Sequence, residues 1–194
     1  MSNTSATGGY LTPSSPAPLY DDALTDALQA MVVGITGLNG TLVRPRWQER
    51  PPKMPEPTVD WCAIGVLNFV QDVYGAQVHS SDGEGSTTLY RTEIIEVLAS
   101  FYGPNRTGNA MLMSDGMQIN QNWEAIAPVG VAFVEGGAPR QAADLLNNQW
   151  VVRSDLQITF RRMVSRTYPI LNVLSAHGSI QTDRPSSQDF DTEN

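Results

Sequence analysis

The feature that most constrains the fold is a long alternation of side chains between Val151 and Val164. Successive side chains of a strand point to opposite faces, so the pattern predicts a strand with one buried face and one wet face. The buried series is Val152, Ser154, Leu156, Ile158, Phe160 and Val164, and the wet series is Val151, Arg153, Asp155, Gln157, Thr159 and Arg161. Arg162 interrupts the buried series, and we therefore expect the strand to leave the core there.

The residues that follow predict a partner for this strand. Residues 166–169, Arg-Thr-Tyr-Pro, indicate a bend, and residues 170–180 indicate a second extended segment that returns. A sheet that is open to solvent on one face is normally antiparallel.

The totals suit one folded domain with tails. The chain has 194 residues, and a folded part of about 150 residues buries roughly 70% of its extended-chain surface. The single cysteine, Cys62, excludes an internal disulfide framework and is typical of a small buried hydrophobe in a reducing compartment. The first residues lack the features of a secretion signal, and no apolar run approaches the ~18 residues of a membrane span. We therefore expect a soluble protein with no membrane partner.

The formal charge of −8 argues against a general nucleic-acid binder, which would need a basic face to neutralise phosphates. The same charge suits a surface past which DNA slides without sticking. It is also typical of ordinary solubility, and the two interpretations stay open.

Residues 1–19 are rich in Ser, Thr, Gly and Pro and predict a flexible arm, which only a neighbour would order. A helix is predicted from Asp21 to about Val33, because two carboxylates at its start suit the helix dipole and an apolar stripe follows at helical spacing. The stripe consists of Leu24, Leu28, Met31, Val32 and Ile35. Glycines at positions 34, 37 and 40 then end the helix.

Residues 41–48 are predicted to form a short edge strand, because Pro45 has no amide hydrogen to donate to a neighbour. A run of four prolines follows and makes a stiff, extended loop beside Arg44, Arg46 and Trp47. This loop is either a surface connector or a rigid contact element.

Residues 59–73 form the most hydrophobic strand candidate, and residues 76–81 form a shorter one. Residues 82–85, Asp-Gly-Glu-Gly, predict a hairpin turn, because glycine adopts the positive φ angles of short turns. Residues 87–101 return as a long strand that starts wet and ends buried. Such a strand would project its hairpin beyond the core.

A second helix is predicted from Thr107 to about Asn122, and it contains three methionines that suit adaptable core filler. Leu112, Gly116, Ile119 and Trp123 are expected on one line of this helix, with Met113 and Met117 beside it. The strand residues expected to pack against the two helices are Leu156, Ile158 and Phe160. Residues 129–135 predict a short strand, and residues 139–148 predict a loop or one helical turn.

These elements predict an α+β fold: a mostly antiparallel β-sheet with two main helices packed on one face, a long projecting hairpin and flexible arms at both ends. The predicted domain boundaries are an arm at 1–19, one α+β domain at 20–181 and an acidic tail at 182–194. The polar tail is expected to be mobile in isolation.

No motif predicts a catalytic, cofactor or metal site. The chain lacks a glycine-rich phosphate loop, a nucleophile elbow, a metal-spaced set of Cys or His and a dinucleotide fingerprint. His79 and His177 are expected at the surface, and the carboxylates Asp82 and Glu84 are more often a solvated turn than a cation site. We expect no cofactor and no enzyme. The alternatives are a small hydrolase or ligand-binding enzyme of unknown substrate, and a nucleic-acid-binding accessory protein.

Six segments form a series along the chain. They are PLYDDAL at 18–24, GITGLNGTLVRPRWQ at 34–48, DWCAIGV at 60–66, SFYGP at 100–104, DGMQINQ at 115–121 and RTYPILNVLSAHGSI at 166–180. In this order and spacing, the series resembles the phage neck or tail terminator proteins over nearly the whole folded part. The N-terminal arm and the acidic tail depart from the family pattern.

The resemblance implies a structural virion protein of the tail or neck, made in the host cytoplasm, with helices on a mostly antiparallel sheet. It implies a ring, usually of six subunits, which caps the head-proximal end of the tail tube, stops tube polymerisation and gives the neck a docking surface. The implied partners are further copies of the chain, the tail tube protein, the neck or head–tail connector protein and, in a contractile tail, the sheath protein. DNA would pass through the lumen without specific binding.

A ring also requires one surface of each subunit to meet a different surface of the next. Arginine suits such interfaces, because its planar fork pairs with carboxylates and stacks on aromatic rings. For Arg153 and Arg161, a role as solvated strand residues stays open. The candidate interface residues are Arg44, Arg46, Trp47, Pro51, Pro52, Asp82, Glu84, Arg161, Arg162 and Arg166.

Overall fold

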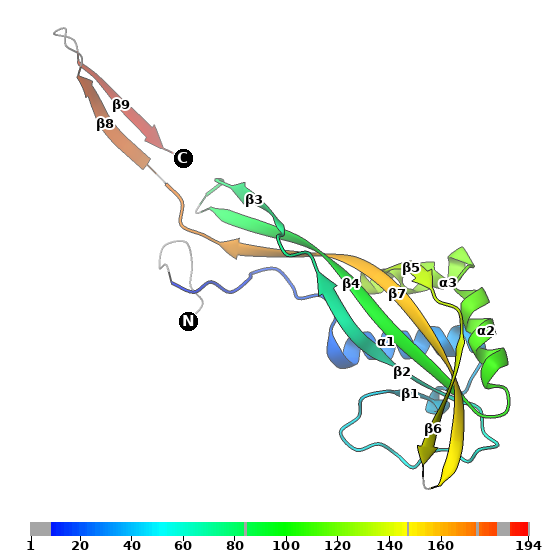
Figure 1. Cartoon of the computed structure of the whole chain (residues 1–194). Coiled ribbons are helices and arrows are strands. Elements are labelled where there is room, and N and C mark those ends of the chain that lie inside the picture. The colour runs from blue at the N-terminus through cyan, green and yellow to red at the C-terminus, as the bar shows by residue number, and fades with distance from the viewer. Residues whose placement is uncertain (1–8, 84, 147, 174, 182–186, 194) are drawn as a thin grey trace. The chain divides into compact units, whose positions relative to one another are not determined.

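A computed structural model describes residues 9–83, 85–146, 148–173, 175–181 and 187–193 (Figure 1). The chain divides into two compact units. The core unit comprises Pro18–Asp72 and Thr92–Met163, and the hairpin unit comprises Val73–Arg91 with the described residues before Pro18 and after Met163. The domain boundaries predicted from the sequence, at 19/20 and 181/182, stay a prediction.

The core unit is built on one sheet. Its strands are β1 (Val43–Pro45), β2 (Trp61–Gln71), β4 (Ser86–Tyr102), β5 (Ala132–Gly136), β6 (Arg140–Leu146) and β7 (Gln149–Pro169), of which β4 and β7 continue into the hairpin unit. The order is β1-β2-β4-β7-β5, and β6 also pairs with β7. β1 runs parallel to β2, whereas β2 with β4, and β5 and β6 with β7, are antiparallel. The edge position predicted for the Pro45 strand is confirmed.

The alternating segment forms the centre of β7, and its buried face is confirmed. Leu156, Ile158 and Phe160 are at most 1% exposed, although Val152 near the start is 38% exposed. β7 continues to Pro169 but leaves the core unit after Met163, within one residue of the position expected from Arg162. Arg162 is itself buried, since Glu93 supplies a counter-charge inside the fold.

Three expectations about strands are wrong. Residues 139–148 are not a loop or a helical turn: they contain β6, which pairs in regular register with residues 149–155 of β7. Residues 166–169 do not bend but continue β7. The segment after them does not return to β7, because β8 (Ser175–Gln181) pairs with β9 (Ser187–Glu193) in a separate two-stranded sheet. In each case backbone pairing fixes a strand that the apolar pattern does not show.

Three α-helices occur among the described residues, where the sequence predicted two main ones. α1 (Asp21–Thr36) confirms the first, and Gly37 ends it with a φ angle of 72°. The second prediction is wrong in extent, because α2 (Arg106–Gly116) and α3 (Asn120–Ile126) are separate. A side chain at position 116 would clash with Ile35 of α1, so the glycine lets α2 end in close contact with α1. Two short 3-10 helices, η1 (Gly40–Leu42) and η2 (Ala127–Val129), complete the unit.

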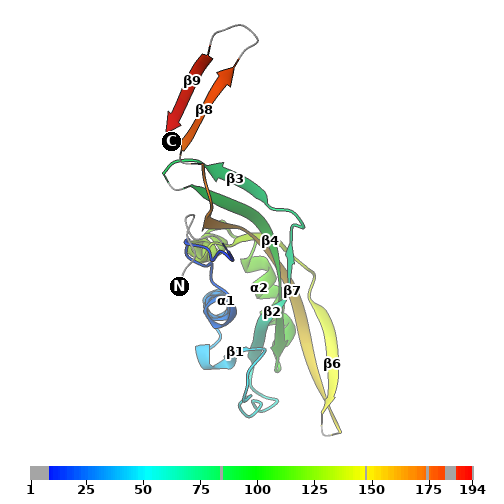
Figure 2. The ribbon, with the colours of Figure 1, turned by 90° about the vertical axis from the view of Figure 1, so that its left-hand side faces the viewer.

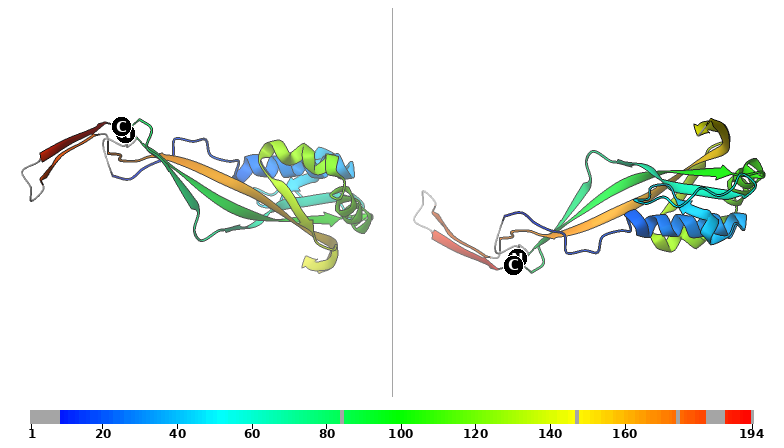
Figure 3. Two further views of the ribbon diagram at one scale, coloured as in Figure 1. Left: turned by 90° about the horizontal axis from the view of Figure 1, so that it is seen from above. Right: turned by 90° about the horizontal axis from the view of Figure 1, so that it is seen from below.

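The helices cover one face of the core-unit sheet, as predicted (Figures 2 and 3). Their buried residues join those of β2, β4 and β7 in one hydrophobic core, which includes Leu24, Leu28, Met113, Met117, Ile126, Cys62, Ile64, Val97, Phe101, Leu156, Ile158 and Phe160. Burial confirms the packing role predicted for Cys62 and for Met113 and Met117. The core role predicted for Met111 is wrong, because it is 48% exposed. Leu112 and Ile119, on the line predicted along the second helix, are 47% and 57% exposed. The opposite side of this sheet is called the helix-free face below.

β2 contains a bulge between Val66 and Asn68. Leu67 has no partner in the register of β2 with β4, which resumes at Asn68 opposite Glu96. A bulge bends its strand and increases the local twist. The second half of β2 therefore follows a different direction from the first half.

The hairpin predicted in the next segment is confirmed within the hairpin unit. β3 (Ala76–Ser80) pairs with residues 86–90 of β4. Gly83 and Gly85 adopt φ angles of 59° and 88° in the turn, and the Gly85 N–H donates to the Asp82 carbonyl. Glu84 lies outside the described residues.

Residues 9–19 of the predicted N-terminal arm contain no helix or strand. The Ser14 N–H donates to the Thr167 carbonyl at 2.8 Å, so this part of the arm runs beside β7. Residues 1–8 of the arm, and 182–186 and 194 of the predicted tail, lie outside the described residues, whereas Ser187–Glu193 form β9. None of the described helices has the length and apolar character needed to cross a membrane.

Candidate interface surfaces

The segment after β1 crosses over β2. The Arg46 N–H donates to the Ile64 carbonyl at 2.7 Å, and the Trp47 indole Nε1 donates to the Val66 carbonyl at 3.1 Å. Gly65 makes this crossing possible, because a Cβ there would lie 2.9 Å from the Arg46 Cβ. Trp47 remains 70% exposed, so it presents an aromatic surface beside β2.

Arg46 begins a polar chain across the helix-free face. Its Nη2 donates to Ser100 Oγ, and Ser100 Oγ donates to Asp155 Oδ1 at 2.5 Å. Arg153 Nε donates to both Asp155 carboxylate oxygens at 3.0 Å, and Arg153 Nη1 donates to Asp144. The chain links β4, β6 and β7 to the segment after β1. Both arginines therefore direct charge-assisted hydrogen bonds to partners within the same chain.

Two aromatic rings stack beside this polar chain. The Trp61 and Tyr102 centroids are 4.1 Å apart, with an interplanar angle of 6°. Arg44 lies over Trp61 at 5.8 Å from the ring centroid, and its Nη1 donates to the Lys53 carbonyl in the proline loop at 2.9 Å. A groove of about 240 Å³ separates this loop from the start of β7, where Trp150 is 69% exposed. Aromatic rings with one exposed side are frequent anchors of protein interfaces.

A second groove, of about 280 Å³, follows the outer edge of β2 beyond Trp47. β2 contributes Leu67 and Phe69 to its lining, and the first turn of α1 contributes Asp21 and Asp22. Neither aspartate forms an ion pair with a cation among the described residues. This groove is therefore acidic on its helix side and apolar at Leu67 and Phe69, and Arg46 also contributes to its lining.

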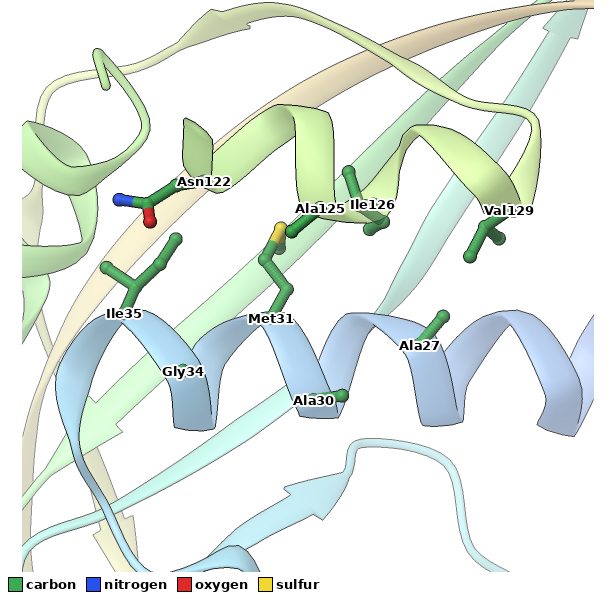
Figure 4. Close-up of a pocket in the computed structure, with 9 residues that line it drawn as sticks. All are labelled: Ala27, Ala30, Met31, Gly34, Ile35, Asn122, Ala125, Ile126 and Val129. Atoms are coloured by element: carbon green, nitrogen blue, oxygen red, sulfur yellow. The ribbon is translucent and has the colours of Figure 1, made fainter. Parts of the chain in front are cut away.

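A third groove, of about 290 Å³, lies between α1 and α3 (Figure 4). Ala27, Ala30 and Gly34 line it from α1, and Ala125 lines it from α3. Asn122, at one end, donates its Nδ2 hydrogen to the Gly116 carbonyl at 2.8 Å. The lining suits close packing but offers no acid, base or nucleophile.

Arg162 and Glu93 form a buried ion pair in the core unit, with Nε and Oε2 2.8 Å apart and each side chain 1% exposed. Arg162 Nη1 donates to the Leu19 carbonyl at 2.6 Å, and its guanidinium lies 4.3 Å from the Tyr20 ring centroid. Glu93 Oε1 accepts hydrogen bonds from Tyr20 Oη at 2.8 Å and from Gln71 Nε2 at 2.5 Å. The cluster joins the entry to α1 with β2, β4 and β7.

The electrostatics of this cluster favour a charged carboxylate. Burial by itself would raise the pKa of Glu93, but hydrogen bonds from Tyr20, Arg162 and Gln71 outweigh it and hold the pKa below its ordinary value. Because Arg162 is 4% exposed, its partners are internal. Its place among the surface candidates is therefore corrected.

The reactive side chains weighed in the sequence are the Cys62 thiol and the two histidines. Burial raises the pKa of the Cys62 thiol far above its usual range, which outweighs the opposite effect of the nearby Arg46. His79 and His177 are exposed, as the sequence predicted. The described residues contain no group of three or more His, Cys, Asp and Glu that could hold a metal ion.

The structure gathers only half of the predicted interface residues. Arg44 lies in β1, and Arg46, Trp47, Pro51 and Pro52 lie in the segment between β1 and β2, where both prolines are exposed. The others are spread over the fold: Arg161 is exposed on the helix-free face, Asp82 is exposed in the hairpin unit, Arg166 is half-buried there and Glu84 lies outside the described residues. Their contacts with partners stay a prediction.

Comparison with known protein families finds a match that covers most of the chain. A family profile described as "Phage neck terminator protein" matches residues 22–184. The chain belongs to this family. As a phage neck terminator, the protein is a structural component of the virion tail or neck and interacts with other tail or head proteins. No curated protein sequence matches the chain.

Several surface features of this terminator were not predicted from the sequence, although a signal for them exists. Trp61 and Tyr102 lie in two of the segments that carry the family resemblance, DWCAIGV and SFYGP. Asp21 and Asp22 lie in a third, PLYDDAL, where the local pattern indicates only a helix start. DWCAIGV and SFYGP pair across β2 and β4, and PLYDDAL contributes to the groove beside β2. The family segments themselves are therefore the sequence signal for these surfaces.

Proposed function

We propose that this terminator forms a closed homo-oligomeric ring of six subunits at the head-proximal end of the tail tube. There it stops tube polymerisation and offers a docking surface to the neck or head–tail connector protein. The observation that carries the proposal is the family match over residues 22–184, which spans nearly all of the core unit and so concerns the fold rather than one motif.

A protein that ends a polymer needs two unlike surfaces, one that binds the last tube ring and one that refuses a further ring. The core unit supports this requirement, because the described helices cover one face of its sheet and not the other. We infer that subunits made in the host cytoplasm assemble on the finished tube. In a contractile tail, the sheath protein is a further partner.

The charge distribution supports a ring through which DNA passes without specific binding. The chain carries a net charge of −8, and Arg44, Arg46, Arg153 and Arg162 all have hydrogen-bond partners within the chain. An inward basic belt would bind passing phosphates and retain the genome in a salt-dependent way. We propose that the lumen is neutral or acidic.

Disruption of the gene in an otherwise intact phage tests the function. Electron micrographs of the lysate should then show tails of uncontrolled length that lack heads, and the intact gene supplied in trans should restore joined particles. Tails of normal length joined to heads in the absence of the protein would overturn the proposal. The mass of the purified protein at micromolar concentration separates a closed ring from a monomeric enzyme.

A further inference from the structure

We propose that the outer edge of β2 between Leu67 and Val70 is a strand-addition site, and that its occupant is β6 of a second copy of the chain. The inference rests on the proposed ring and names the contact that closes it. A strand added to a sheet edge gains main-chain hydrogen bonds, and the flanking side chains select the partner.

The edge is uncovered among the described residues. β1 pairs only with Cys62–Ile64, and the Trp47 indole Nε1 donates a hydrogen bond to the Val66 carbonyl. The Asp72 N–H donates to the Thr92 carbonyl at 3.2 Å, so Asp72 faces β4. Backbone groups of an antiparallel strand alternate in direction, and those of Phe69 therefore point outward.

This edge also lacks the features that commonly prevent a sheet edge from pairing with another chain. Natural edges are commonly blocked by charged residues, prolines or a covering element. The sequence Leu67-Asn68-Phe69-Val70 contains neither charge nor proline, and its three apolar residues are 38% to 47% exposed. By contrast, the covered part of the edge lies beside Pro45. An unblocked apolar edge in a soluble subunit indicates a surface that assembly covers.

The groove beside the edge restricts the chemistry of the occupant. Asp21 and Asp22 form its helix side and have no ion-pair partner among the described residues. An arginine or lysine of the strand that fills the groove would be attracted to these carboxylates. An acidic strand would be repelled.

β6 fits these requirements. It pairs with β7 along one side through seven residues without a register shift, and no described strand pairs with its other side. The strand begins with the exposed Arg140, which has no ion pair among the described residues, and Arg153 neutralises its only carboxylate, Asp144. β5 suits the site less well, because a bulge interrupts its pairing and Glu135 would approach the aspartates.

The positions of the two edges match a ring. In the order β1-β2-β4-β7, with β6 on β7, the free edges of β2 and β6 lie on opposite sides of one sheet. Such an arrangement makes contacts head to tail, because each subunit offers a different surface to each of its two neighbours. A contact between two β2 edges would stop at a dimer.

Cysteine cross-linking tests the contact directly. Val70→Cys and Leu145→Cys, both at exposed positions, are combined in one chain and treated with a short bismaleimide. Cys62 is 0% exposed, so the native background should not react. We expect a ladder of covalent oligomers from the double variant but not from either single variant, nor from Val70→Cys combined with Met111→Cys on the exposed face of α2.

Charge exchange tests the same contact without a cross-linker. Val70→Lys should weaken ring formation about tenfold or more, because it places an unpaired charge in the edge. Leu145→Glu in the same chain should recover most of the loss, since each lysine then meets a glutamate of the next subunit. Met111→Lys is the control and should assemble like the native protein.

The outcomes separate this inference from the proposed function. Six-membered rings that give no more cross-linking than the Met111 control would overturn the strand contact and leave the function standing. Cross-linked rings from a protein whose absence leaves tails normal would support the contact and overturn the function. Preparations with neither rings nor cross-links would overturn the contact.

Discussion

Arg162 is the residue whose environment differs most from its sequence expectation. Its charge sits in the interior because Glu93, 69 residues away in the chain, accepts its Nε hydrogen. The ion pair is not itself strong evidence of stability, because the desolvation of two charges opposes their attraction. Removal of one partner alone lowers stability strongly, since the remaining charge is left buried and unpaired.

Arg162→Met should therefore lower the free energy of unfolding by about 3–5 kcal/mol. The matched control is Arg161→Met at the exposed neighbouring position, which should change it by no more than about 0.5 kcal/mol. Urea denaturation measures both. Equal stability of the two variants would show that the buried pair is not needed. The double variant Arg162→Met/Glu93→Leu should recover part of the loss.

The same cluster predicts a dependence of stability on pH. The pKa of Glu93 is lower in the folded chain than its unfolded value of about 4.3, so the unfolded chain binds the proton first as the pH falls. The contribution of Glu93 is thus fully present above about pH 4.3 and is lost as the pH falls through the folded pKa. Denaturation curves for native protein and Glu93→Gln should converge over that acidic range, and curves that stay parallel would contradict the assignment.

At the scale of single elements, the sequence pattern of β7 predicts its buried face correctly. Leu156, Ile158 and Phe160 are spaced for one face of a strand and were located from local pattern alone. Phe160→Ala should lower the free energy of unfolding by about 3–5 kcal/mol, through lost burial and the cavity left behind. Met163→Ala, at a position 71% exposed on the same strand, is the control in thermal denaturation. A similar melting temperature for both variants would refute the core role.

The turn between β4 and α2 depends on one glycine. Gly103 has a φ angle of 100°, and a Cβ there would lie 2.6 Å from the Val59 carbonyl oxygen. Gly130 is also left-handed, with φ of 84°, but has open space around it. Gly130→Ala should cost about 1–2 kcal/mol from its backbone conformation, and Gly103→Ala should cost about 1–3 kcal/mol more from the clash. Equal losses in chemical denaturation would mean that the backbone near Val59 yields easily.

Elements with a strong local pattern were predictable, and those fixed by distant contacts were not. α1 and β7 carry apolar side chains at their own period, so the sequence locates them. β6 has only small or polar residues before Leu145 and exists because β7 pairs with it. α2 ends at Gly116, which lies against Ile35, a residue 81 positions away. A single-sequence pattern contains no information about such pairs.

The surfaces were predictable in part for the same reason. The sequence located the stretch around Arg46 and Trp47 because prolines and arginines gather there, and both residues do lie over β2. It did not locate the uncovered edge at Phe69, because exposure of a strand edge depends on where the neighbouring strand ends. It placed Arg162 at a surface because its partner could not be recognised from spacing.

At the scale of the whole molecule, the net negative charge predicts weak binding of DNA by the assembled protein. Purified rings should not retain a short DNA duplex in a gel at moderate salt, because the chain carries a net charge of −8 and several arginines are engaged internally. Arg161→Ala should leave this result unchanged, although Arg161 is exposed. Tight binding that weakens steeply as salt rises would contradict the neutral or acidic lumen.

The bulge at Leu67 has a consequence for curvature. Head-to-tail contacts give a closed circle only when the rotation from one subunit to the next divides a full turn, about 60° for six copies, and otherwise they give an open spiral. The bulge lies where the covered part of β2 ends and the free edge begins, and it sets the twist of that edge. If neighbours join there, one inserted residue controls the number of copies in the circle, although it contributes little to how tightly they bind.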